Sequence, residues 1–313
     1  TFLMQILLNL ACKGEMSLSK SKIKTESSSC KNDSSFVLLY YLLKIILPKI
    51  FSNLISKILS PKIIRYSIGY SYHNDHTKSL DCYKEVKNPV GRFLADPFTL
   101  EHDGCNFIFV EDLFYADNKG RISAIKVDGD KYEFLGVVLE ENFHLSFPYV
   151  FSHDNKIYMI PESSQNKDIR LYKCINFPMK WKLDRVLMSD VSAADTLLIN
   201  KDKIWFMLTN ICSANFDDHQ SELHIFYSDD LKSGSWQPIL SGNPVIFDPH
   251  KGRNGGIFFH KGKIYRVNQV HGMGHYGKSF KINEIVSITK NEYVEEEIMD
   301  INPNFKKGII ATH

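Results

Sequence analysis

The chain is poor in the features that assign a function directly. Its 313 residues include six cysteines, and no two are spaced as Cys-x-x-Cys, so the sequence predicts neither a disulfide framework nor a zinc site. We therefore expect a reducing, cytoplasmic location. The 38 Lys and Arg are balanced by 36 Asp and Glu, and no stretch concentrates basic residues, so nucleic acid is not an expected partner. Gly-x-Ser-x-Gly and His-Glu-x-x-His patterns are also missing, and no metal or cofactor is expected.

The chain also lacks an uninterrupted apolar run long enough to span a bilayer. Residues 35–60 are the most apolar stretch, but Lys44, Pro48 and Lys49 interrupt it. The Ile and Leu residues after Pro48 recur at helical spacing, which predicts an amphipathic helix that packs on protein or on a membrane surface. Residues 1–34 are rich in Lys and Ser, which is typical of a flexible segment, and they show no signal-peptide order.

Four copies of one pattern dominate the rest of the chain. Each copy is an apolar strand, a polar turn and a second apolar strand that ends in a polar residue. The copies are Ala95–Glu111 (ADPFTLEHDGCNFIFVE), Phe147–Glu162 (FPYVFSHDNKIYMIPE), Ala194–Asn210 (ADTLLINKDKIWFMLTN) and Gly255–Gln269 (GGIFFHKGKIYRVNQ). Asp-Gly, Asp-Asn and Lys-Gly at the turns tolerate the positive φ of two-residue hairpin turns. Hairpins that recur about every 50 residues indicate a β-propeller with one four-stranded blade per repeat.

Further strands complete each repeat. Third strands are expected at 120–127, 168–175, 222–228 and 277–288, and fourth strands at 131–139, 181–188, 236–240 and 292–298. Two strands, Arg65–Tyr72 and Gly308–Thr312, have no local partner, and we expect them to pair in a composite fifth blade. The prediction is an all-β fold: a five-bladed β-propeller over residues 63–313, preceded by a short N-terminal helical extension in residues 1–62. The alternative is a β-sandwich with accidental internal similarity.

Four carboxylates are candidate catalytic residues. In a propeller, the starts of the innermost strands and the ends of the second strands face one mouth of the axial channel. Asp96 and Asp195 start innermost strands, while Glu111 and Glu162 end second strands. Because polar groups on apolar strands are costly unless they face a polar cavity, these carboxylates could work as a paired acid and base. The alternative for each is a structural hydrogen bond within the blades.

Four more residues are candidates for substrate binding. Arg253 and Asn254 lie in a Gly-rich loop before the fourth copy, where a guanidinium and backbone amides suit an anion. His144 precedes the second copy, and His271 lies near the mouth of the fourth. The alternative for Arg253 is an ordinary surface arginine.

The blocks ADPFTLEHDG, HLSFPYVFSHDNKIYMIPES and GRNGGIFFHKGKIYR resemble one family. It is the N-terminal propeller of plant glucosamine inositolphosphorylceramide transferases, which has bacterial relatives joined to formyltransferase-like domains. The resemblance covers about residues 65–313 and implies sugar transfer by a separate C-terminal transferase domain. The chain is also similar to the five-bladed propellers of arabinanases and levansucrases, where three acidic residues begin inner strands. Asp96 matches the first, Ser146 and Phe147 stand in place of the second, and Asp195 stands where Glu is usual.

These features predict a carbohydrate-active propeller domain from a system of glycan, glycolipid or surface-polysaccharide biosynthesis. Two alternatives stay open: a non-catalytic glycan-binding module, and a glycoside hydrolase that uses paired carboxylates. For a hydrolase, a carboxyl separation of about 5–5.5 Å indicates retention and about 6.5–9.5 Å inversion. The expected partners are a glycan or sugar-phosphate ligand, a transferase domain, and a membrane surface that residues 35–60 contact.

Overall fold

The computed structural model describes residues 40, 43–44, 47–48, 66–71, 83–212, 219–232, 235–272 and 275–312. The chain divides into two units, Thr1–Arg65 and Tyr66–His313, and the strands of the described residues lie in the second. The amphipathic helix expected at 35–60 lies outside the described residues, apart from a few isolated positions, and so does the polar segment 1–34. Among the residues that are described, no helix has the length and apolar character needed to cross a membrane.

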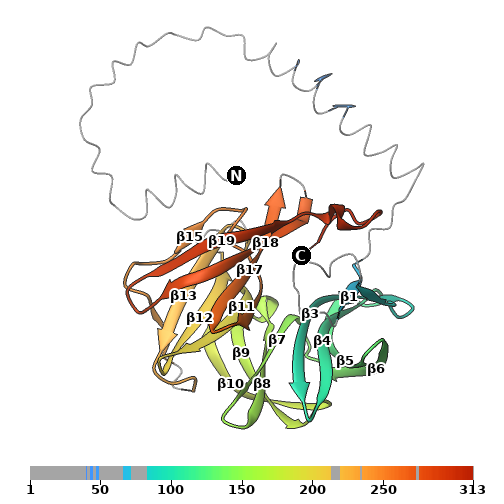
Figure 1. The fold of residues 1–313 in the computed structure, drawn as a ribbon, viewed down its shortest axis with the longest axis horizontal. Helices are drawn as coiled ribbons and strands as arrows, with labels where there is room; N and C mark the ends of the chain where they lie inside the picture. Colours follow the sequence, from blue (N-terminus) through green and yellow to red (C-terminus); the bar gives the residue numbers. More distant parts are fainter. Residues whose placement is uncertain are drawn as a thin grey trace. The chain divides into compact units, whose positions relative to one another are not determined.

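The second unit consists of antiparallel sheets arranged as propeller blades (Figure 1). Blade one contains β3 (Arg92–His102), β4 (Cys105–Phe114), β5 (Lys119–Asp128) and β6 (Lys131–Leu139), and blade two contains β7 (Ser146–His153), β8 (Lys156–Glu162), β9 (Asp168–Asn176) and β10 (Lys180–Ser189). Blade three contains β11 (Ala193–Lys201), β12 (Ile204–Ile211), β13 (Glu222–Ser228) and β14 (Gln237–Pro238), with β15 (Ile246–Phe247) also paired to β13. Blade four contains β16 (Asn254–His260), β17 (Lys263–Gly272), β18 (His275–Ile288) and β19 (Tyr293–Ile301). The predicted third and fourth strands are therefore confirmed.

The hairpin turns that define the repeat have the backbone that their residues favour. Asp103 and Gly104 in blade one have φ values of 50° and 70°, and Asp154 and Asn155 in blade two have 49° and 55°. The equivalent turns of blades three and four also have positive φ at both central residues. This is the two-residue turn whose twist matches paired strands, so the Asp, Asn and Gly residues at these sites fix the register of each hairpin.

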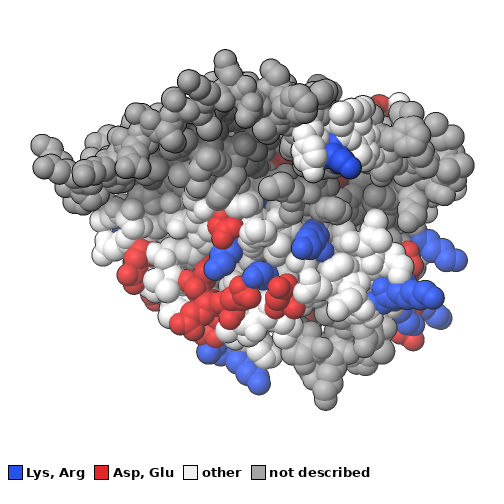
Figure 2. All heavy atoms as spheres, turned by 90° about the horizontal axis from the view of Figure 1, so that it is seen from above, with Lys and Arg blue, Asp and Glu red and all other residues white. Residues whose placement is uncertain are grey.

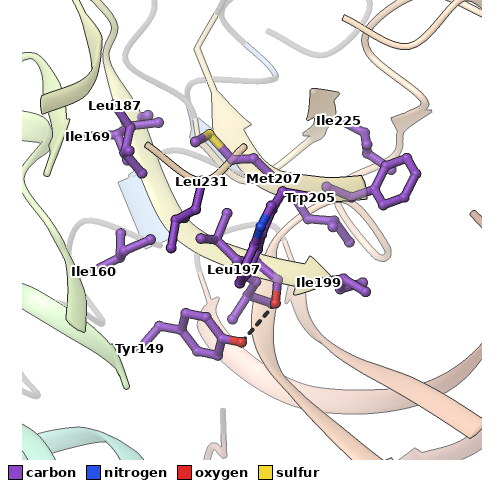
Figure 3. Close-up of a cluster of buried hydrophobic side chains, with 14 of the residues drawn as sticks. Tyr149, Ile160, Ile169, Leu187, Leu197, Ile199, Trp205, Met207, Ile225 and Leu231 are labelled. Carbon is purple, nitrogen blue, oxygen red and sulfur yellow. Dashed lines mark hydrogen bonds between the residues drawn. The ribbon is translucent and has the colours of Figure 1, made fainter. Parts of the chain in front are cut away.

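The blades pack on one another through apolar side chains of their inner strands. The largest buried cluster joins blades two and three around Leu197, Trp205 and Met207 (Figure 3). Tyr149 of β7 crosses into it and donates a hydrogen bond from its hydroxyl to the Leu198 carbonyl at 2.8 Å. Fully burying one large apolar side chain stabilises a fold by about 1.5–3 kcal/mol, so this cluster holds neighbouring blades in fixed relative positions.

The predicted fifth blade is wrong. The described residues form four blades, and β1 (Ile68–Tyr70) pairs with β2 (Lys84–Val86) instead of with the C-terminal segment. Ile68 and Val86 pack with Leu94 of β3 and so cover one face of blade one. The prediction failed because β2 supplies a partner close in sequence, while residues 308–312 contain no strand.

Among the described residues, side chains connect the segment just before β2 with the segment that follows β19. The ring of Tyr83 meets that of Phe305 edge to face, with centroids 6.4 Å apart, and Lys306 Nζ lies 4.2 Å from the Tyr83 ring centroid. A Cβ atom at Gly69 would come within 2.3 Å of the Tyr83 ring, so glycine in β1 leaves the space that this tyrosine fills. The ends of the unit thus meet at an aromatic contact.

Charge on the described surface is mixed. In the view of Figure 2, many of the acidic side chains gather in one group, with basic side chains beside it and others at the opposite edge of the view. On β18 and β19, for example, Lys281 pairs with Glu297 at 2.7 Å.

Candidate functional site

Each innermost strand changes register at the same point of its blade. The shifts lie between Ala95 and Phe98 in β3, Ser146 and Tyr149 in β7, Ala194 and Leu197 in β11, and Asn254 and Gly256 in β16. Within the first three bulges Asp96, Phe147 and Asp195 have φ values of 48°, 45° and 49°. Left-handed backbone is costly for such residues and bulges redirect side chains, which makes these positions candidates for a functional site.

Asp96 contacts the neighbouring blade. Its Oδ2 accepts a hydrogen bond from the Phe147 backbone N–H at 3.3 Å. The Phe147 side chain is buried and meets Phe98 edge to face, with centroids 4.8 Å apart. Blade two therefore supplies a backbone donor at the position where blades one and three carry Asp96 and Asp195.

Asp195 is buried and ion-paired. Its Oδ2 lies 2.6 Å from Arg253 Nε and 3.3 Å from Gln269 Nε2, and its side chain is 2% exposed. Burial raises the pKa of Asp195 well above its usual range, Arg253 lowers it, and nearby carboxylates raise it again. Asn254 supports this arrangement, because its Nδ2 donates to the Asp195 carbonyl at 2.8 Å.

Glu111 pairs with a histidine from the segment between blades one and two. Its Oε1 lies 3.1 Å from His144 Nε2, and the glutamate is buried. Burial raises the pKa of Glu111 to about 7, the hydrogen bond from His144 lowers it, and Asp96 and Glu162 raise it. A carboxyl group with this pKa can hold and release a proton near neutral pH.

The four predicted carboxylates lie close enough to affect one another's ionisation. Asp96 and Glu162 both raise the pKa of Glu111 and of Asp195. Glu162 also accepts a hydrogen bond from Ser164 Oγ at 2.6 Å. Because charge interactions weaken with distance, residues from three blades must converge at one end of the inner strands. We call this group the axial cluster: Asp96, Glu111, His144, Glu162, Asp195 and Arg253.

Sequence reasoning missed Tyr66, which lies ahead of β1. Burial raises the pKa of Tyr66, Asp96 and Glu111 raise it further, and Arg253 lowers it, so the phenol lies near the axial cluster. Asn88 holds the segment by donating to the Tyr66 carbonyl at 2.6 Å. No local motif marks Tyr66, since only the three-dimensional fold brings it to residues of the blades.

Two predicted binding residues make polar contacts within the protein. Asn254 is fully buried, and its Oδ1 accepts from Arg266 Nη1 at 3.2 Å. His271 is buried on β17, and its Nδ1 accepts from the Gly277 N–H at 3.3 Å. Both contacts belong to the scaffold of blade four, and a part for either residue in ligand binding stays a prediction.

A phosphate-binding pattern occurs in a context that does not suit it. Residues 272–279 read GMGHYGKS, which matches Gly-x-x-x-x-Gly-Lys-Ser. That motif needs a strand, a loop and then a helix, whose N-terminus faces the phosphates. Here β17 ends at Gly272 and β18 begins at His275, so the pattern spans a hairpin. We therefore do not assign a nucleotide-binding site to this pattern.

A separate hollow lies at the other end of the inner hairpins. Its volume is about 500 Å³, and its lining includes His102, His153 and Asp154 from the turns of blades one and two. None of the axial-cluster residues lines it. Within the described ranges, no three His, Cys, Asp or Glu side chains are grouped to hold a metal ion.

The comparisons with known proteins agree with this fold. The chain is 36% identical over 221 residues to Glucosamine inositolphosphorylceramide transferase 1 of Oryza sativa subsp. japonica, and 34% identical over 211 residues to the protein of that name from Arabidopsis thaliana. These matches cover 69% and 66% of this chain but only 29% and 27% of the plant proteins, so the chain spans less than a third of their length.

A family 117 glycoside hydrolase from Zobellia galactanivorans has a similar fold, with a TM-score of 0.51 at 11% identity over 76% of this chain and 75% of that chain. At that identity the likeness shows the fold alone. Residues 79–312 match the family described as Glucosamine inositolphosphorylceramide transferase 1, N-terminal. The predicted association with formyltransferase-like domains stays a prediction. The chain belongs to the Glucosamine inositolphosphorylceramide transferase 1, N-terminal family.

Proposed function

We propose that this chain is the carbohydrate-recognising propeller of a glycosyl-transfer protein involved in glycolipid synthesis, and that its sugar ligand binds at the axial cluster. The observation that carries this proposal is the convergence of Asp96 and Asp195, from bulges of the innermost strands, with Glu111 and Glu162, from the second strands beside such bulges. Carboxylates accept charge-assisted hydrogen bonds, which suits the hydroxyl groups of a sugar. Family membership supports the glycosyl-transfer context.

The charge of the axial cluster indicates which class of sugar it can bind. Arg253, the residue expected to bind an anion, already pairs with Asp195 at 2.6 Å. Asp96, Glu111 and Glu162 remain, so the cluster favours a neutral or amine-bearing sugar and opposes a sugar phosphate. The names of the plant relatives include glucosamine, which is an amine-bearing sugar. We therefore favour an amino sugar over the alternative of a sugar phosphate.

A second candidate function is glycoside hydrolysis. Glu111 has a pKa raised to about 7 beside other carboxylates, and glycosidases pair a protonated carboxyl group with an ionised one. A purified propeller that releases sugar from a synthetic glycoside, and loses this activity in Glu111→Gln, would favour hydrolysis over binding alone.

Calorimetric titration with methyl glucosaminide, methyl glucoside and glucose 1-phosphate tests the proposal. Asp96→Asn and Glu162→Gln should each weaken binding of the amino sugar at least about tenfold, because each removes a charged acceptor. Glu101→Gln is the matched control, since Glu101 is exposed at the far end of β3 and should bind like the parent protein. Tight glucose 1-phosphate binding, or equal affinity in all variants, would contradict the proposal.

The cytoplasmic location and the contact of residues 35–60 with a membrane surface are further parts of the proposal. Liposome flotation of the chain with and without residues 35–60 tests the contact. Loss of flotation on deletion supports it, and equal behaviour of both proteins contradicts it.

A further inference from the structure

The segment before β7 is clamped by two blades. From blade one, Lys119 Nζ contacts the Glu141 carbonyl oxygen at 2.9 Å. From blade two, the Tyr172 hydroxyl donates to Glu141 Oε1 at 2.7 Å, and Gln165 Oε1 accepts from the His144 N–H at 2.7 Å. These contacts fix the backbone that carries His144, so its ring enters the axial cluster in a defined position.

Both nitrogens of the His144 ring have partners. Nδ1 accepts the Gly120 backbone N–H at 3.0 Å, while Nε2 lies 3.1 Å from Glu111 Oε1. A nitrogen that accepts a hydrogen bond must keep its lone pair, so Nε2 carries the hydrogen and donates it to Glu111. An imidazolium would place a second N–H against the N–H of Gly120.

Glycine is required for this contact. A Cβ atom at residue 120 would lie 2.4 Å from the Leu145 carbonyl oxygen, 2.7 Å from His144 Cε1 and 2.8 Å from His144 Nε2. Any side chain there would push the imidazole away from both of its partners. Gly120 is therefore a positioning residue for His144.

The groups around Glu111 favour a proton on the carboxyl group. The charges of Asp96 on β3 and Glu162 on β8 raise the pKa of Glu111, and Glu111 in turn raises the pKa of Tyr66 ahead of β1. The hydrogen bond with Glu111 and the charges of Glu111, Glu162 and Asp96 raise the pKa of His144, and burial lowers it, but the geometry of the Gly120 N–H opposes protonation of Nδ1. The carboxyl group also has a donor that opposes its protonation, the Nε2–H of His144, but this donor contacts Oε1, and burial outweighs it and raises the pKa of Glu111.

We propose that Gly120 fixes His144 as a neutral Nε2–H donor, so that Glu111 is the group that takes up and releases the proton at the axial cluster. This inference rests on the proposed function in one respect: the group that receives the proton is an oxygen of the proposed ligand. When the proton is donated, the Glu111 O–H bond breaks and a bond forms between the proton and a ligand oxygen. The carboxylate that remains accepts the Nε2–H of His144.

NMR of the full chain without any ligand tests this assignment. The protein is labelled with ¹⁵N at histidine and ¹³C at the glutamate carboxyl carbon, and the His144 and Glu111 signals are assigned from His144→Gln and Glu111→Gln. Between about pH 5 and pH 8, His144 should keep one protonated and one unprotonated nitrogen, while the Glu111 carbon shift titrates. Conversion of His144 to imidazolium in this range, with Glu111 already ionised, would overturn the proposal.

Gly120→Ala tests the positioning role. With the Nδ1 contact broken, His144 should gain a second proton within this pH range, and the Glu111 carbon should titrate at lower pH. An unchanged His144 spectrum in folded Gly120→Ala would overturn the role of Gly120. If that variant does not fold, Glu111→Gln decides: His144 must remain neutral there, and an imidazolium would refute the proposal. Absence of sugar binding would refute the proposed function and leave these ligand-free results unaffected.

Discussion

Arg253 Nε lies 2.6 Å from Oδ2 of Asp195, and this pair joins the loop before blade four to the innermost strand of blade three. The Asp195 side chain is 2% exposed and that of Arg253 is 14% exposed. Water therefore screens the pair poorly, so removing one partner would leave the other charge without compensation in the interior. The contact positions Asp195 in the axial cluster and links two blades.

Arg253→Met should destabilise the protein by about 3–5 kcal/mol at neutral pH, because it leaves a buried carboxylate unpaired. The loss should become smaller as the pH falls, because burial raises the pKa of the unpaired Asp195 and the carboxylate takes up a proton. Urea unfolding of the single variant Arg253→Met and of the double variant Arg253→Met, Asp195→Asn provides the measurement. A double variant as unstable as the single one would show that the pair is not the cause.

The stability of the protein should depend on pH through Glu111. Burial raises the pKa of Glu111 from 4.5 to about 7 in the folded state, so the folded protein holds a proton that the unfolded chain releases. The contribution of this proton to the free energy of unfolding is fully present below about pH 4.5 and is lost as the pH rises through about 7. Its full size is about 3 kcal/mol. Glu111→Gln removes the ionisation and should flatten this dependence.

Urea unfolding at several pH values, with Glu101→Gln as a control that keeps the slope of the parent, checks the effect of Glu111. An identical pH dependence in Glu111→Gln and the parent protein would place the titrating group elsewhere.

A second buried ion pair supports blade four. Arg266 is fully buried, its Nη2 lies 2.6 Å from Glu295 Oε1, and its Nη1 donates to Asn254. Arg266→Met should cost about 3–5 kcal/mol, whereas Lys281→Met, which breaks the more exposed pair with Glu297, should cost less than about 1 kcal/mol. Denaturant titration of the two variants compares them directly. Equal losses would refute the distinction.

The contact between Tyr83 and Phe305 should couple the two ends of the second unit. Their rings meet edge to face with centroids 6.4 Å apart, and such pairs contribute about 0.5–1.5 kcal/mol beyond burial. A double-mutant cycle of Tyr83→Ala and Phe305→Ala should give a coupling energy of about 1 kcal/mol. A coupling energy of zero within error would show that the two ends are stabilised independently.

Much of the blade architecture was predictable because it depends on local chemistry. Turn residues such as Asp103 and Asp154 fix the hairpins, and alternation of apolar residues places the strands. The number of blades was not predictable in the same way. The partner of β1 is β2, and a strand as short as Lys84–Val86 has too few residues to show a periodic pattern.

The axial cluster was predictable only in part. Asp96 and Asp195 occupy one equivalent position of the repeat and Glu111 and Glu162 another, and both positions lie at the same end of the blade, so rotation about the axis brings the four together. The partners that set their chemistry come from outside the repeat. The Gly120 N–H, for example, reaches His144 only because the intervening segment folds back between two blades.

A crystal structure of the protein soaked with methyl glucosaminide tests the central claim most directly. The account predicts density for the sugar within hydrogen-bonding distance of the Asp96 and Glu162 carboxylates, and no such density in Asp96→Asn crystals soaked in the same way. Sugar bound instead in the hollow lined by His102 and His153, or equal density at the axial cluster in both crystals, would contradict it.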